Sequence, residues 1–94
     1  MNNSLEAYRL KIDEIDRDLA VLLARRFAVV DCISAYKRNN GVGIRNEARE
    51  KLVADRAADL AGAAYGEDVR KVYESLFAVS RARQEKMIQD EKNL

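Results

Sequence analysis

The chain has 94 residues, the length of a single domain, and its charged residues, 35% of the sequence, nearly cancel to a net charge of +1. This balance argues against a protein that binds nucleic acid or an acidic membrane through a broad basic surface. One cysteine, Cys32, and no histidine exclude a disulfide within the chain and Cys–His nucleophilic catalysis, and argue against a transition-metal site.

Neither a membrane span nor a secretory leader is visible in the sequence. No apolar run approaches 18 residues, and the N-terminus lacks the pattern of a signal peptide. Together with the single cysteine, these features favour the reducing cytoplasm. We therefore expect one cytoplasmic domain over residues 1–94, with no membrane or nucleic-acid partner.

The first predicted element is a very long helix. From Leu5 to Ile33, apolar residues recur every three or four positions, the spacing of a helix with one buried face. Candidate N-caps are Asn2, Asn3 and Ser4, and candidate end signals are Asn39, Asn40 and Gly41. Such a helix of roughly 35 residues is about 50 Å long, whereas a compact domain of this size is only about 30 Å across. We therefore expect it to bury its apolar face against a second copy of the chain.

Two shorter helices are predicted to follow. Asn46 is a suitable N-cap for the second helix, whose inner face is expected to carry Glu50, Val53, Ala57, Leu60 and Ala61. After a break at residues 62–66, the third helix is predicted from Val69 to Ile88, and the polar tail beyond Ile88 is expected to fray. No alternation typical of strands occurs, so the predicted fold is all-α with three helices.

Several polar residues share the faces that should be apolar. Arg9, Arg26 and Lys37 lie on or beside the stripe of the first helix, and Glu50, Ser80 and Gln84 lie on the inner faces of the other two. Because an unpaired buried charge is costly, this grouping indicates a polar pocket, rich in cations and suited to an anion.

Spacing along the first helix separates these cations into two groups. Arg26 and Lys37 are eleven residues apart, about 16 Å along one helical face, so both can contact a small ligand placed between them. Arg9 lies about 25 Å from Arg26 and cannot reach that ligand within its own chain. An antiparallel second copy could bring another Arg9 to that place.

Each of these residues also has a simpler interpretation. Arginine and lysine beside an apolar stripe often keep their charge in water while burying their stems. Glu50 could simply interact with the helix dipole in the first turn. Arg49 could be a solvated residue, and Ser80 and Gln84 could be small interruptions of the core.

The ordered set of residues resembles the all-helical (AroQ-class) chorismate mutases from about Leu5 to Gln84. The similar segments are Arg9-x-x-Ile12-Asp13-x-Ile15-Asp16-x-x-Leu19, Leu22-Leu23-x-x-Arg26, Lys37, Arg49-Glu50 and Ser80-x-x-x-Gln84. The resemblance implies an intertwined homodimer with two sites. It also implies the rearrangement of chorismate to prephenate without a cofactor, a metal or a covalent intermediate.

The resemblance also implies a role for each polar residue. Arg26 and Arg9 of a second copy would hold the two substrate carboxylates, and Lys37 and Gln84 would donate to the ether oxygen. Glu50 would accept from the ring hydroxyl, and Arg49 and Ser80 would help to orient and bind the substrate.

Asn46 departs from the family pattern, because many members carry aspartate there, near the ring hydroxyl. This leaves open whether the ring substituent is a hydroxyl or, as in 4-amino-4-deoxychorismate, an amino group. Two more functions fit this helical pattern. One is an isochorismate–pyruvate lyase, whose relatives typically lack the equivalent of Glu50, and the second is a helical dimerisation module without catalysis.

Overall fold

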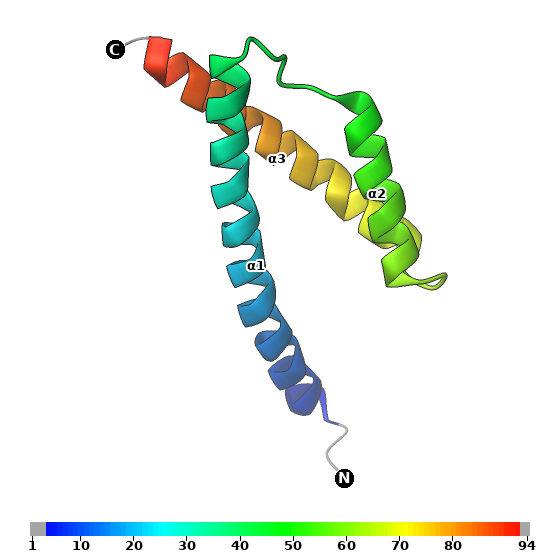
Figure 1. The fold of residues 1–94 in the computed structure, drawn as a ribbon. Helices are drawn as coiled ribbons and strands as arrows, with labels where there is room; N and C mark the ends of the chain where they lie inside the picture. The colour runs from blue at the N-terminus through cyan, green and yellow to red at the C-terminus, as the bar shows by residue number, and fades with distance from the viewer. Residues whose placement is uncertain (1–3, 93–94) are drawn as a thin grey trace.

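The computed structural model describes residues 4–92 and contains three α-helices (Figure 1). Their bounds are Leu5–Asn39 for α1, Glu47–Ala61 for α2 and Gly66–Lys92 for α3. Residues 4–92 contain no strand, and the predicted all-α class with three helices is confirmed. The third helix continues to Lys92, four residues beyond its predicted end at Ile88.

Side-chain caps define where α1 and α2 begin. Ser4 Oγ accepts a hydrogen bond of 3.2 Å from the Ala7 N–H, and Asn46 Oδ1 accepts one of 3.0 Å from the Arg49 N–H. These bonds satisfy N–H groups that have no partner within the first turn. Ser4 and Asn46 are therefore confirmed as N-caps, whereas the candidate caps Asn2 and Asn3 lie outside the described residues.

The described chain is elongated, with extents of 58 × 29 × 15 Å and a radius of gyration of 17.0 Å. A compact chain of this length would have a radius of gyration of roughly 12 to 13 Å. The cause is α1, whose C-terminal half packs on α3 while its N-terminal half extends away from the other helices (Figure 1).

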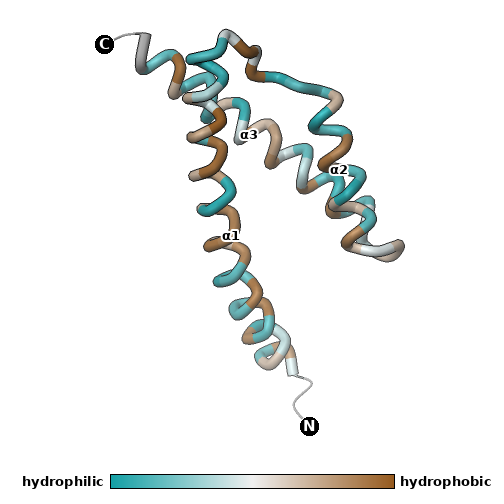
Figure 2. The backbone as a smooth tube through the Cα atoms, in the orientation of Figure 1, coloured by the Kyte–Doolittle hydropathy of each residue, from teal (hydrophilic) through white to brown (hydrophobic). Residues whose placement is uncertain are grey.

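The projecting half of α1 carries an apolar stripe that no other part of the described chain covers. Hydrophobic positions recur along it (Figure 2). The side chains of this stripe, each about half exposed, are Leu5, Tyr8, Ile12, Ile15, Leu19 and Leu22. Exposed apolar surfaces of this kind are typical of sites that interact with other chains.

Small residues hold α2 close to α3. Ala54, Ala57 and Ala58 are buried on α2, and α3 is the helix that α2 contacts in the described chain. A Cβ atom at Gly66 would lie 3.0 Å from the Ala58 carbonyl oxygen, so a glycine at the start of α3 allows the two helices to approach.

Leu60 does not lie on the inner face of α2, and that prediction was wrong. Its side chain is 89% exposed. The face of α2 that meets α3 is centred on the three buried alanines, and Leu60 lies about 110° around the helix from that centre.

In the part of the chain that the structure describes, no helix is long and apolar enough to cross a membrane.

Candidate active site

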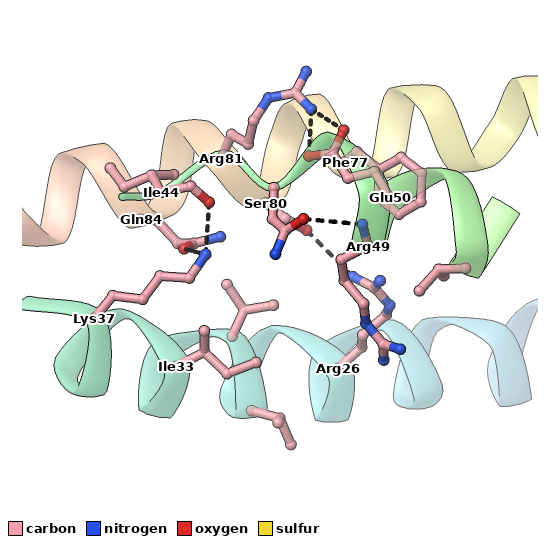
Figure 3. A pocket seen from close by; sticks show the side chains of 14 residues that line it. Arg26, Ile33, Lys37, Ile44, Arg49, Glu50, Phe77, Ser80, Arg81 and Gln84 are labelled. Atoms are coloured by element: carbon pink, nitrogen blue, oxygen red, sulfur yellow. Dashed lines mark hydrogen bonds and ion pairs between the residues drawn. The ribbon is translucent and has the colours of Figure 1, made fainter. Parts of the chain in front are cut away.

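A pocket of about 360 Å³ lies between the C-terminal half of α1, the start of α2 and the middle of α3 (Figure 3). Seven of the eight residues proposed from the sequence line it: Arg26, Lys37, Asn46, Arg49, Glu50, Ser80 and Gln84. The chain thus brings together residues from three helices that are up to 58 positions apart in sequence.

Lys37 and Gln84 are held together at one end of the pocket. The Lys37 Nζ atom donates to the Ile44 carbonyl at 2.6 Å and to Gln84 Oε1 at 3.3 Å. Since an ammonium group has three N–H donors, one remains for a ligand. The Gln84 side chain is buried, and because its oxygen accepts from Lys37, its amide N–H groups also remain as donors.

Arg26 and Arg49 supply cations at the other end. The Arg26 Nη1 atom donates to Ser80 Oγ at 3.3 Å, and its guanidinium lies 6.0 Å from the centre of the Tyr73 ring. Arg49 extends from α2 toward Arg26 (Figure 3). Among the described residues, neither arginine forms an ion pair with a carboxylate.

Glu50 pairs with Arg81, a lining residue that the sequence analysis missed. The Arg81 Nη1 atom lies 2.5 Å from Glu50 Oε1 and 2.7 Å from Glu50 Oε2. Arg81 directly follows Ser80, and consecutive helical residues point about 100° apart, so it lies beside the face on which Ser80 and Gln84 were placed. Its spacing of three from Gln84 is the signal that could have revealed it.

The pocket as a whole is cationic. Its lining includes four cationic side chains, Arg26, Lys37, Arg49 and Arg81, but one carboxylate, Glu50, which gives a formal charge of +3. Low-dielectric walls strengthen such a field and attract anions of opposite charge. The arrangement therefore suits a small, multiply charged anion with a further polar group that reaches Glu50.

Arg9 is not part of this pocket in its own chain. It lies on the projecting half of α1, is largely exposed and has its Nη1 atom 3.9 Å from Glu6 Oε1. Seventeen residues separate it from Arg26, which is about 25 Å along a continuous helix.

Two ion pairs outside the pocket connect α3 to the other helices. Arg83 donates to both carboxylate oxygens of Asp31 on α1, at 2.5 and 2.7 Å, and this hydrogen bonding lowers the pKa of Asp31. Arg70 donates to Asp55 on α2 at 2.6 Å. Hydrogen bonds from Lys51 and then Arg70 lower the pKa of Asp55. These contacts help to fix the helices that line the pocket.

Comparison with known protein families identifies a match for this chain. The family model described as chorismate mutase type II matches residues 8–85, a range that includes parts of all three helices and every site residue proposed from the sequence. No curated protein and no solved structure matches the chain significantly.

Proposed function

The chain belongs to the chorismate mutase type II family, and we propose that it rearranges chorismate to prephenate in the pocket between its three helices. The reaction is intramolecular: a C–O bond breaks as a C–C bond forms, so the protein supplies neither a nucleophile nor a cofactor. Its task is to hold the compact diaxial conformer and to stabilise the negative charge that grows on the ether oxygen.

The observation that carries this proposal is the pairing of Lys37 with Gln84. Their 3.3 Å hydrogen bond places two side chains with remaining N–H donors at the same point of the pocket. We assign both to the ether oxygen. Donors fixed before the reaction stabilise the developing charge without having to reorganise.

The remaining polar groups are assigned to the ends of the substrate. Arg26, held by Ser80 at 3.3 Å, and Arg49 are suited to carboxylates, because a guanidinium can donate two parallel hydrogen bonds. Glu50 is assigned to the ring hydroxyl, from which a carboxylate can accept.

A second copy of the chain completes the site in this proposal. The exposed apolar stripe of α1 supports burial against another α1, since burying apolar surface stabilises association. An antiparallel arrangement would bring Arg9 of that copy close to Arg26, where it could bind a substrate carboxylate. Each site would then draw on both chains.

The test is to supply the purified protein separately with chorismate, isochorismate and 4-amino-4-deoxychorismate and to identify the products by NMR. We expect prephenate from chorismate at the highest kcat/KM of the three. Faster release of pyruvate from isochorismate would instead establish a lyase. Absence of turnover with all three by a folded dimer would contradict a catalytic role.

A further inference from the structure

The roles assigned above leave the ion pair between Glu50 and Arg81 unexplained. Both side chains line the pocket, and they are 22% and 25% exposed. Figure 3 shows the Glu50 carboxylate turned toward Arg81, on the side of the pocket away from Arg26 and Lys37. The carboxylate assigned to the ring substituent therefore already has a cationic partner.

This partner leaves Glu50 able to accept but compensates its charge. A carboxylate has about four sites for hydrogen bonds, and Arg81 uses one on each oxygen. A neutral hydroxyl can occupy a remaining site without adding charge. An ammonium group would add a second cation beside the guanidinium, with one carboxylate to serve both.

Asn46 does not restore negative charge at this end of the pocket. It is neutral, and its side-chain oxygen accepts the Arg49 N–H at 3.0 Å. One lone pair of this oxygen and the two amide N–H groups remain for a ligand, but none of them supplies a negative charge to balance an ammonium group. The other charged side chains that line the pocket, Arg49 on α2 and Arg26 and Lys37 on α1, are all cations.

We propose that Arg81 is a specificity-determining residue, which makes this site select a ring hydroxyl over a ring ammonium at the same carbon. Substrates with a ring ammonium, such as 4-amino-4-deoxychorismate, are thus disfavoured. The sequence alone did not distinguish this substrate from chorismate. This inference rests on the proposed function, in which the ring substituent of the substrate lies against Glu50. The pocket's formal charge of +3 acts in the same direction, since the ammonium substrate has one negative charge fewer overall.

The test compares kcat/KM for 4-amino-4-deoxychorismate with kcat/KM for chorismate, measured at neutral pH in the wild type and in Arg81→Met. The substitution removes the charge and keeps an unbranched side chain. Removing a like charge from beside the substrate ammonium should raise this ratio by about 10- to 100-fold. Arg81→Lys, which retains the charge, should keep the ratio close to that of the wild type.

Arg83→Met is the matched control. Arg83 also lies on α3 and also donates to both oxygens of a carboxylate, that of Asp31, but it does not line the pocket. The Arg83→Met variant should leave the ratio of the two kcat/KM values unchanged. A loss of packing at Arg81 would slow both substrates together, so an unchanged ratio in Arg81→Met would overturn the proposal.

A second measurement needs the wild type alone and can still overturn the proposal if Arg81→Met does not fold. The same ratio is followed as pH rises through the pKa of the free 4-amino substrate. Loss of the ammonium charge should raise the ratio, and a flat ratio would overturn the proposal. Absence of prephenate from chorismate in the wild type would instead refute the proposed function, so the two failures are distinguishable.

Discussion

The assignment of Arg9 to the site of a second copy predicts complementation between two inactive variants. In Arg9→Ala each chain keeps its own Arg26, and in Arg26→Ala each chain keeps the Arg9 that it would contribute. The distance of about 25 Å along α1 prevents one chain from using both arginines in one site. Each variant alone should lose about 100-fold or more in kcat/KM, as expected for removal of one fixed charge-assisted donor.

The size of the rescue follows from two-fold symmetry. When equal amounts of the variants are unfolded together and refolded, about half of the dimers should contain one chain of each kind. In such a dimer one site has both arginines and the other has neither. About one quarter of all sites should therefore be intact, and the mixture should show about one quarter of the wild-type kcat/KM.

The assay is the initial rate of prephenate formation per milligram of refolded protein. As a control, Arg9→Ala is refolded with the double variant Arg9→Ala/Arg26→Ala, a mixture in which no site can be complete. Activity in the test mixture no greater than in this control would refute the assignment. So would a monomer in sedimentation at micromolar concentration, because the site would then have to be complete within one chain.

Three further outcomes are expected. Lys37→Ala should lower kcat by about 100-fold or more and change KM less, because its contact strengthens in the transition state; steady-state kinetics in which KM alone rises would contradict this. Gln84→Glu should lower kcat/KM at pH 7.5 and recover part of it toward pH 5, because a glutamate donates only when protonated; pH profiles parallel to the wild type would show that Gln84 does not donate. Asp31→Asn should remove stability that the Arg83 contact supplies. Because the pKa of Asp31 is lowered from 3.8 in the folded chain, this stability is fully present well above pH 3.8 and is lost as pH falls through the lower folded value. Urea unfolding should thus show a lower free energy of unfolding for the variant than for the wild type at pH 7, and this difference should shrink in strong acid. An equal difference in the free energy of unfolding at both pH values would contradict the linkage.

The features predicted correctly from the sequence are those that depend on local chemistry. Ser4 and Asn46 cap helices through bonds to residues three positions away, a distance that is visible in the sequence. The shared faces of Arg26 and Lys37, and of Ser80 and Gln84, follow from helical periodicity alone. The pocket lining confirms that these four residues converge.

The features that were missed depend on how one helix is rotated against another. Helical spacing from Val53 and Ala57 predicts Leu60 on the inner face, whereas the buried face of α2 is centred on alanines that allow close approach to α3. Arg81 was missed because its partner, Glu50, lies 31 positions away on another helix. The Ile44 carbonyl that holds Lys37 belongs to the backbone of a connecting segment, where a pattern of side chains gives no information.

The continuity of α1 also limits which insertions and deletions this chain can accept. In the proposed dimer, one helix carries Arg9 for one site and Arg26 and Lys37 for the other, so its length sets the spacing between two active sites. One residue inserted between Arg9 and Arg26 would turn them about 100° relative to each other and separate them by a further 1.5 Å. Seven residues would nearly restore the facing but add about 10 Å. The connections at residues 40–43 and 62–65 contain no residue that lines the pocket and do not set the spacing between the two sites. Length variation among relatives should therefore accumulate there rather than within α1.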